Sequence, residues 1–114
     1  MARTSTRLPG SRYKKVFEQG RSVRGRLMSA WVLPSPDAGQ KAGVVVSKKS
    51  FHDAVDRNRA KRIMREGFRL AAEWFVSAEW VLVGRASLGG MRTRDVIREL
   101  RHLAKKAEVL CKSY

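Results

Sequence analysis

The strongest hydrophobic pattern of the chain lies between residues 51 and 75, where apolar side chains recur at the spacing of an α-helix. On a helix with about 100° per residue, the cations of this segment fall within an arc of roughly 140°, and the apolar residues occupy the opposite side. We predict a helix from residue 51 or 53 to about residue 75, with one buried face and one basic face. The buried face would contain Ala60, Ile63, Met64, Gly67, Leu70, Ala71 and Trp74. The basic face would contain Arg57, Asn58, Lys61, Arg62, Arg65 and Arg69.

Three apolar segments have the composition of β-strands, at residues 26–33, 41–48 and 80–85. Prolines and a glycine at residues 34–39 indicate a loop between the first two segments, which we expect to pair antiparallel, with the first one split or preceded by a short strand. The second segment contains three consecutive valines, which is typical of a strand buried on both faces or central in a sheet. Because the predicted basic helix connects the second and third segments, we predict a βαβ unit whose two strands are parallel.

Two further helices are predicted near the ends of the chain. Ser11 is a suitable N-cap and Gly20 a suitable stop for a helix over residues 11–19, and Thr93 can cap a last helix. The apolar face of the last helix would contain Val96, Leu100, Leu103, Ala107 and Leu110. With 114 residues and no repeat or long linker, the sequence predicts a single domain, in which residues 1–8 form a mobile N-terminal extension.

The net charge of the chain predicts a binding partner. Lys and Arg number 25 against 10 Asp and Glu, a formal net charge of +15, while 43% of the residues are hydrophobic. That much apolar side chain excludes a disordered basic tail, so the charge lies on a folded domain that a phosphate-rich partner would neutralise. Solvated helix faces usually mix charges at i,i+4 spacing, whereas Arg57, Lys61, Arg65 and Arg69 repeat one sign at that spacing. The basic face therefore predicts binding to the phosphates of a nucleic acid.

Cysteine usage and hydropathy indicate an intracellular, reducing setting. Cys111 is the sole cysteine and can form no internal disulfide. No apolar run approaches the roughly 20 residues of a membrane span, and the N-terminus lacks the apolar centre of a secretory signal. The first 25 residues also have the composition of an organellar transit peptide, but Tyr13, Val16 and Phe17 are spaced to pack a helix onto a core.

Catalysis by the side chains of this chain is poorly supported. The acidic residues are scattered, whereas a metal-dependent nuclease needs acidic ligands gathered around Mg²⁺. His52 and His102 are isolated, and Ser47 and Cys111 lack a neighbouring base. We therefore expect a binding protein whose partner supplies the chemistry, with an autonomous metal nuclease as an alternative of another class. DNA binding is less favoured, because the helix has no helix-turn-helix partner.

Aromatic residues form a second feature, for which two interpretations stay open. Tyr13 and Phe17 lie at i,i+4 on the first predicted helix, and Trp31 lies in the middle of a predicted strand. Such residues usually face a core. They could equally form a platform on which unpaired bases stack, at about 1–3 kcal/mol per base.

The sequence as a whole resembles the bacterial ribonuclease P protein component. The signature is VSKK at residues 46–49, followed by AVDRNRAKR at 54–62 and REGFR at 65–69. The similarity extends to YKKVF at 13–17 with the glycine and arginine that follow, and it covers roughly residues 8–111. It implies an α+β fold, a single small α/β sandwich like domain 2 of ribosomal protein S5, with the element order α-β-β-β-α-β-α. The valine strand would be central, and the basic helix would lie in an unusual left-handed βαβ crossover.

The resemblance also implies a function, the removal of the 5′ leader from precursor tRNA by a ribonucleoprotein whose RNA subunit performs Mg²⁺-dependent hydrolysis. The protein would supply no catalytic residue, and the Mg²⁺ would be used by the RNA partner. The protein would work in the cytoplasm without a membrane or an obligate protein partner. The catalytic RNA would be bound by Arg57, Asn58, Arg59, Lys61, Arg62, Arg65 and Arg69. A cleft between the first helix and the sheet would bind the single-stranded leader through Tyr13, Phe17, Trp31, Val46 and Lys48. A ribosomal or other structured-RNA-binding protein without a role in processing is the alternative.

Overall fold

The basic helix predicted from the sequence is α2, Ala54–Ala71, in a computed structural model that describes residues 6–111. It ends earlier than predicted, because a 3₁₀ turn, Ala72–Trp74, follows it. The predicted buried face is confirmed except at two positions: Trp74 is half-buried in the 3₁₀ turn beyond the helix, and Leu70 is 43% exposed. Phe68 is buried in place of Leu70, with 1% of its surface exposed. Phe68 takes that place because its ring packs against those of Phe75 and Trp80, at centroid distances of 5.8 and 5.6 Å.

Four strands form one mixed sheet in the order β1-β2-β4-β3. They are β1 (Arg21–Arg24), β2 (Met28–Pro34), β3 (Gln40–Val45) and β4 (Ala78–Gly84). The parallel pairing of β3 with β4 is confirmed, and so is the short strand that precedes β2. The predicted antiparallel pair of β2 and β3 is wrong, because β4 lies between them and pairs antiparallel with β2. The valine strand β3 is consequently an edge strand, and β4 takes a central position.

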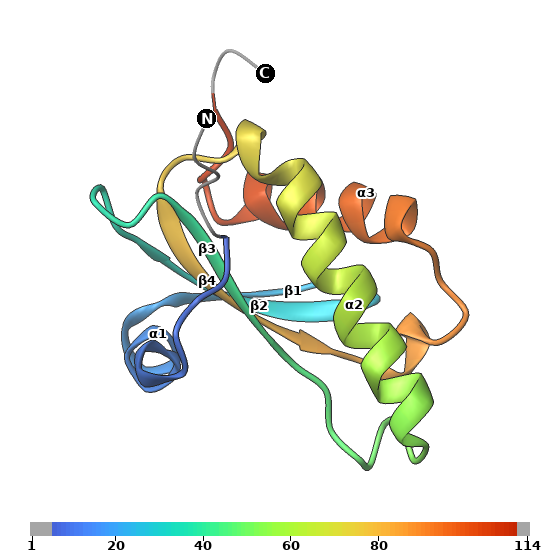
Figure 1. The fold of residues 1–114 in the computed structure, drawn as a ribbon. Helices are drawn as coiled ribbons and strands as arrows, with labels where there is room; N and C mark the ends of the chain where they lie inside the picture. Colours follow the sequence, from blue (N-terminus) through green and yellow to red (C-terminus); the bar gives the residue numbers. More distant parts are fainter. Residues whose placement is uncertain (1–5, 112–114) are drawn as a thin grey trace, which may run out of the picture.

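The βαβ unit places α2 on the same face of the sheet as α3, Thr93–Lys106 (Figure 1). From β3 through α2 to β4, the chain turns in a left-handed sense, against the usual right-handed preference of such crossovers. The observed order of elements, α1-β1-β2-β3-α2-β4-α3, is the one that the resemblance implied. α2 packs on β3 and β4, while α3 reaches β1 and packs along α2. Gly67 permits this close approach of the two helices, because a Cβ there would lie 2.6 Å from Cγ1 of Val96.

Among the helices of residues 6–111, α1, Tyr13–Gln19, is the one that covers the opposite face of the sheet, and it follows a 3₁₀ turn at Gly10–Arg12 (Figure 1). The predicted N-cap, Ser11, lies inside that turn, while the helix does end before Gly20 as predicted. A small apolar cluster joins α1 to the sheet through Val16 and Val81, both fully buried. The larger cluster lies between the sheet and the α2/α3 layer.

The chain segment before α1 pairs with the edge of the sheet. The main-chain N–H of Leu8 donates to the carbonyl of Ala42 at 3.0 Å, and the N–H of Ala42 donates to the carbonyl of Thr6 at 2.7 Å. Leu8 is buried in the α1 cluster. The extension predicted over residues 1–8 is therefore wrong for its last three residues, which cover part of the open edge of β3. Residues 1–5 of that predicted extension lie outside the described residues.

The end of the chain differs from the prediction at one position. α3 ends at Lys106, so Leu110 follows the helix and forms an isolated β-bridge with Phe75. Val96, Leu100, Leu103 and Ala107 are buried as predicted. Within residues 6–111, none of the helices combines the length and the hydrophobicity that crossing a membrane requires.

Candidate nucleic-acid interface

The outer face of α2 carries a row of cations that the fold leaves unneutralised. Arg62 and Arg65 are exposed, and Lys61 is half-buried. The buried residues of α2 lie on its other face, toward the core. Over residues 6–111, none of these three side chains has a hydrogen-bond or ion-pair partner within the chain. Asn58 is exposed beside them, one turn before Arg62. We call Asn58, Lys61, Arg62 and Arg65 the basic rail; it can bind phosphate oxygens without first breaking contacts within the protein.

The other three predicted RNA-binding cations of α2 already have partners. Arg57 donates to the carbonyl oxygens of Phe51 and His52, at 3.0 and 2.8 Å. Arg59 donates to the carbonyl oxygen of Met91 at 2.7 Å and so ties α2 to the segment before α3. Carbonyl partners leave the charge of Arg57 and Arg59 uncompensated, so both still add to the positive field around the rail.

Arg69 differs because its partner is a carboxylate. Its guanidinium forms an ion pair with Glu66 at 2.5 Å. The hydrogen bond and the charge of Arg69 lower the pKa of Glu66, and Glu66 in turn raises the pKa of Arg69. The cationic row is therefore weakest at its C-terminal end, a distinction that the i,i+4 pattern of like charges did not reveal.

Three of the predicted leader-binding residues are brought together where α1 lies on the sheet. Phe17 and Trp31 pack edge to face, with ring centroids 4.9 Å apart and an interplanar angle of 69°. The ring of Tyr13 lies directly on Gly43 of β3, where a Cβ would collide with Cζ and Oη of the tyrosine. Phe17 remains 38% exposed. The rings therefore pack on one another, and part of the Phe17 ring stays exposed to solvent; the stacking of bases on them stays a prediction.

Beyond α1, the sheet continues as an open floor that the sequence analysis missed. Val45 pairs in register with Val83, and Val83 with Ser29, so the three form one row across β3, β4 and β2. All three are half-buried and lie on the α1 face. We call this row, together with Tyr13, Phe17 and Trp31, the aromatic cleft. The alternation of side chains along each strand identifies the floor only once the pairing of the strands is known.

The structure does not bring Val46 and Lys48 to the cleft in the way that the resemblance implied. Val46 points to the other face of the sheet and belongs to the main core, 9% exposed, near Met64 and Leu88. Lys48 is exposed in the turn that follows β3. The Ser47 hydroxyl stabilises this turn by accepting a hydrogen bond from the N–H of Ser50 at 3.1 Å. Lys48 therefore lies on the connection that leads from the end of the cleft floor to α2.

A partly buried ion pair anchors the N-terminal end of α1 to the sheet. Arg12 donates from Nε and Nη2 to the two carboxylate oxygens of Glu79 on β4, at 2.8 and 2.7 Å. Glu79 is only 5% exposed. The hydrogen bonds and charge of Arg12, with a further contribution from Lys15, lower the pKa of Glu79. No local pattern in the sequence indicates this pair, because its members are 67 positions apart.

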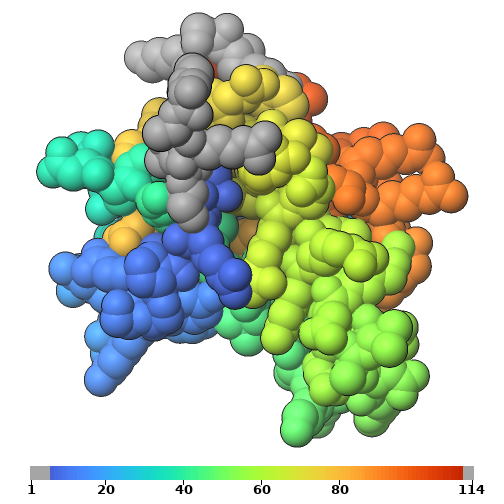
Figure 2. Space-filling model, viewed as in Figure 1, coloured from blue at the N-terminus to red at the C-terminus, as the bar shows by residue number. Residues whose placement is uncertain are grey.

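The two surfaces lie on different layers of the molecule and are joined by one loop. In Figure 2, α1 (blue) and α2 (green) form separate ridges on the visible face. Residues 46–53 connect them, since they lead from the sheet to the start of α2. Within residues 6–111, no three His, Cys, Asp or Glu side chains are grouped closely enough to hold a metal ion. The arrangement can bind phosphates and stack bases.

Comparison with known proteins identifies the same family. The sequence profile of the family described as Ribonuclease P matches residues 2–108. The ribonuclease P protein component of an Exiguobacterium species is 34% identical over 97 residues, which cover 85% of this chain and 84% of that protein. The component of Dehalococcoides mccartyi is 34% identical over 104 residues, covering 89% and 82% of the two chains.

Solved structures agree with these sequence matches. The RNase P protein of Staphylococcus aureus superimposes with a TM-score of 0.77 at 24% identity, over 95% of this chain and all of that one. The protein of Thermotoga maritima gives a TM-score of 0.75 at 24% identity, over 88% and 96% of the two chains. The chain therefore belongs to the ribonuclease P protein family, as a subunit of the holoenzyme that processes the 5′ ends of tRNA.

Proposed function

We propose that the basic rail binds the catalytic RNA of ribonuclease P, while the aromatic cleft holds the single-stranded 5′ leader of precursor tRNA. Hydrolysis is performed by the RNA with Mg²⁺ that the RNA binds. This chain contributes position and charge and no reacting group. The two roles fall on two faces of one sheet, so one small domain can contact enzyme RNA and substrate at the same time.

The observation that carries this proposal is the lack of partners along the rail. Lys61, Arg62 and Arg65 repeat one charge on a single helix face, which costs stability in the free protein. Within the described part of the chain no acidic side chain relieves that repulsion. A phosphate backbone would relieve it and would release counterions as it binds. Structured RNA suits this rail, because phosphate contacts position a protein without requiring a particular base sequence.

The cleft supports the second half of the proposal through its chemistry. Unpaired bases stack on aromatic rings with little dependence on sequence, which is what binding of varied leaders requires. Phe17 and Trp31 offer ring surface, and Val45 and Val83 extend it along the sheet. Paired RNA has its bases stacked inside the helix and gains nothing from such a platform. The cleft therefore favours a single strand.

The protein would assist catalysis through electrostatics. A domain with a net charge of +15 placed between two RNA molecules lowers their mutual repulsion. Less Mg²⁺ is then needed to bring substrate and catalytic RNA together. The expected signature is stimulation of ribonuclease P RNA by the full chain that is largest at limiting Mg²⁺. Lack of any stimulation, with RNA binding intact, would instead favour a structured-RNA-binding protein without a role in processing.

The rail is tested by Arg62→Ala, compared with Lys105→Ala on α3. Both residues are exposed, and each substitution removes one positive charge from a helix surface. Arg62→Ala should weaken binding of the full chain to ribonuclease P RNA about 10-fold, the loss of one charge-assisted contact. Lys105→Ala should change it less than 2-fold. Equal effects of the two substitutions in a filter-binding titration would show that only net charge matters and that the rail is not the contact.

The cleft is tested by Phe17→Ala, with Val76→Ala as a control of similar exposure, 38% against 40%. The measured quantity is the affinity of the reconstituted holoenzyme for precursor tRNA with a long leader, relative to mature tRNA. Phe17→Ala should reduce that ratio about 10-fold, the equivalent of one lost stacking contact. Val76→Ala should leave it unchanged. An unchanged ratio in Phe17→Ala would remove the leader from this cleft.

A further inference from the structure

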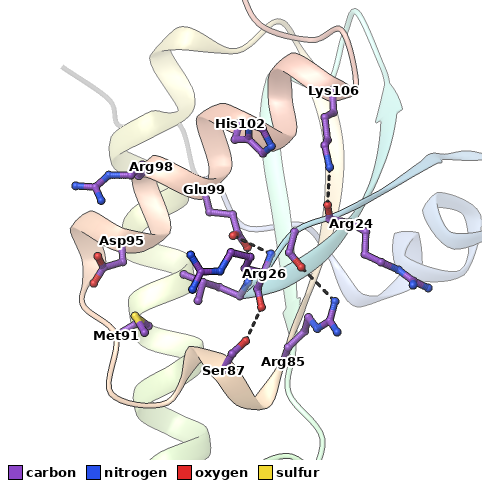
Figure 3. Close-up of a pocket in the computed structure, with 12 residues that line it drawn as sticks. Arg24, Arg26, Arg85, Ser87, Met91, Asp95, Arg98, Glu99, His102 and Lys106 are labelled. Carbon is purple, nitrogen blue, oxygen red and sulfur yellow. Dashed lines mark hydrogen bonds between the residues drawn. The ribbon is translucent and has the colours of Figure 1, made fainter.

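A third basic surface lies at the β1 edge of the sheet, apart from the rail and next to the end of the cleft floor. It is a groove of about 1160 Å³ between α3, the turn that joins β1 to β2, and the segment that follows β4 (Figure 3). Arg26 and Arg85 line one side of it, and Arg98, His102 and Lys106 of α3 line the other. None of these five residues has a role in the interface described above.

The carboxylates of the groove's acidic residues accept hydrogen bonds from main-chain N–H groups. The carboxylate of Glu99 accepts hydrogen bonds from the N–H groups of Arg26, Leu27 and Met28, at 3.0, 2.7 and 2.9 Å. The carboxylate of Asp95 accepts one from the N–H of Arg92 at 2.9 Å. Because these oxygens already hold the β1–β2 turn and the start of α3, they form no ion pair with the cations around them.

The cations of the groove consequently keep their charge. Within residues 6–111, the side chains of Arg26 and Arg98 have no partner. Arg85 and Lys106 donate only to main-chain carbonyl oxygens, those of Gly25 at 3.2 Å and Arg24 at 3.0 Å. Those contacts orient both groups without neutralising them. With five Arg and Lys residues against two carboxylates, the lining has an excess of positive charge. A concave surface with such an excess concentrates its field inside the concavity and attracts the opposite charge.

The shape and lining of the groove select among anionic ligands. Its volume exceeds the roughly 300–1,000 Å³ of a typical small-molecule site, which favours a chain over a single nucleotide. Among the residues that line it, the large apolar side chains are Leu27, which is 7% exposed, and the half-buried Met91. The rest of its apolar surface belongs mainly to the aliphatic stems of the long polar side chains. A peptide would find few apolar anchors there and no Phe, Tyr or Trp ring, which are the side chains that usually anchor protein interfaces. A phosphodiester backbone needs only spaced cations.

The groove also meets the cleft at the edge of β1. Arg24 pairs in register with Ser29, the last member of the cleft floor, and its side chain points away from the groove in Figure 3. A cation therefore stands where the floor ends and the groove begins. A strand that leaves the floor across β1 would reach the groove without crossing an acidic surface.

We propose that this groove is an additional binding site for RNA phosphate backbone. Two sources have that chemistry: the leader or body of precursor tRNA, and a segment of the catalytic RNA. The inference rests on the proposed function only in taking these RNAs as partners. It assigns to α3 and the β1–β2 turn a role beyond carrying the core.

The test compares two double variants of the full chain that remove the same charge from exposed positions. Arg26→Gln/Arg98→Gln removes the two unpartnered cations from opposite walls of the groove. Arg94→Gln/Lys105→Gln removes two cations of α3 that do not line it. Circular dichroism and thermal unfolding establish that both variants fold. One arm measures binding of each protein to ribonuclease P RNA alone; the other measures precursor tRNA binding by holoenzyme assembled at saturating protein.

The groove variant should bind one of the two RNAs about 5- to 20-fold more weakly than the control variant does, and the arm affected identifies the source. The slope of log affinity against log salt should fall by about 1.5, from two lost phosphate contacts at roughly 0.7–0.9 each. Equal behaviour of the two variants in both arms, while the unaltered chain binds RNA, overturns the groove and leaves the proposed function standing. Failure of the unaltered chain to bind either RNA overturns both.

Discussion

The two faces of the sheet are built in opposite ways. The face under α2 and α3 is a continuous core that contains most of the large, fully buried side chains, with Phe68, Phe75 and Trp80 at its centre. The face under α1 has a small cluster around Val16 and Val81, the partly buried Arg12–Glu79 ion pair, and aromatic rings that remain partly exposed. One face is closed by two long helices and the other is only partly covered by two turns of helix.

This difference indicates a division of labour between stability and binding. A sheet buried on one side by a large core keeps its shape even when the other side is left exposed. The α1 face can therefore present apolar and aromatic surface that a free-standing sheet would have to bury. The comparison predicts that substitutions on the α2/α3 face act on folding, and that substitutions on the α1 face act increasingly on leader binding.

The largest effect is expected for Phe68→Ala. This side chain is 1% exposed and contacts two other aromatic rings. Truncation should lower the free energy of unfolding by about 3–5 kcal/mol, because it removes buried area and leaves a cavity. Urea denaturation followed by circular dichroism gives the value. The neighbouring Leu70→Ala, at a position 43% exposed, should cost less than about 1 kcal/mol. Equal costs would mean that the helix packs through the face first predicted from the sequence.

That contrast shows which parts of the fold the sequence determines. The helical period placed α2 and α3 correctly, because most positions of a helix face are set by local spacing. Leu70 and Phe68 were exchanged because both lie near a boundary of the apolar arc. At such a boundary, contacts formed by the fold, here with Phe75 and Trp80, decide which side chain is buried. The pairing of β2 with β3 was wrong for a related reason. Neighbours in sequence usually pair, and nothing local reveals that β4 inserts between them.

The candidate site likewise has features that could be predicted from the sequence and features that depend on the folded structure. The basic rail could be predicted, since it needs only a helix and a row of like charges. The partners of Arg57 and Arg59 could not, because they are main-chain carbonyls brought close by folding. In the valine run of β3, the exposed α1 face belongs to Val45, and Val46 faces the core. A run of identical residues carries no alternation from which that choice could be made.

The second effect in size is expected for Glu79→Gln, which weakens the anchor of α1. The carboxylate is buried and accepts two hydrogen bonds from Arg12, so at pH 7 the substitution should cost about 1–3 kcal/mol of unfolding free energy. Glu73→Gln, an exposed acid in the turn after α2, should change it by less than about 0.5 kcal/mol.

The Glu79 contribution should also depend on pH in a defined direction. Its pKa is lowered in the folded state from the ordinary value of 4.5. The stabilisation is therefore fully present above about 4.5 and is lost as the pH falls through the lowered value. Denaturation curves of the unaltered chain and Glu79→Gln should converge in acid. Curves that stay parallel from pH 7 down to acid unfolding would show that the ion pair does not stabilise the fold.

A smaller effect, divided between stability and binding, is expected for Gly43→Ala. The added methyl group would occupy the space of the Tyr13 ring, so the ring and α1 must move. The unfolding free energy should fall by about 1–2 kcal/mol, the lower part of the range for overpacking. Affinity for long-leader precursor should fall as well. Gly10→Ala is the control, because a Cβ there meets nothing within 4 Å.

A double-mutant cycle distinguishes this collision from a general intolerance of alanine in β3. With Tyr13→Ala already present, Gly43→Ala should cost little or even stabilise, since alanine is favoured over glycine in a strand by roughly 0.5–1 kcal/mol. A cost that is the same with and without the tyrosine ring would locate the strain elsewhere and separate Gly43 from the cleft.

The smallest effect on folding is expected for Phe17→Ala, the same substitution that should weaken leader binding most. Phe17 is 38% exposed, and its edge-to-face contact with Trp31 is worth about 0.5–1.5 kcal/mol. Its removal should lower the unfolding free energy by about 1 kcal/mol, a shift of a few degrees in melting temperature. A loss as large as that of Phe68→Ala would mean that the α1 face is a second core. A small loss, together with reduced leader affinity, would show that the ring remains partly exposed for its ligand, because a residue retained for packing alone gains nothing from that exposure.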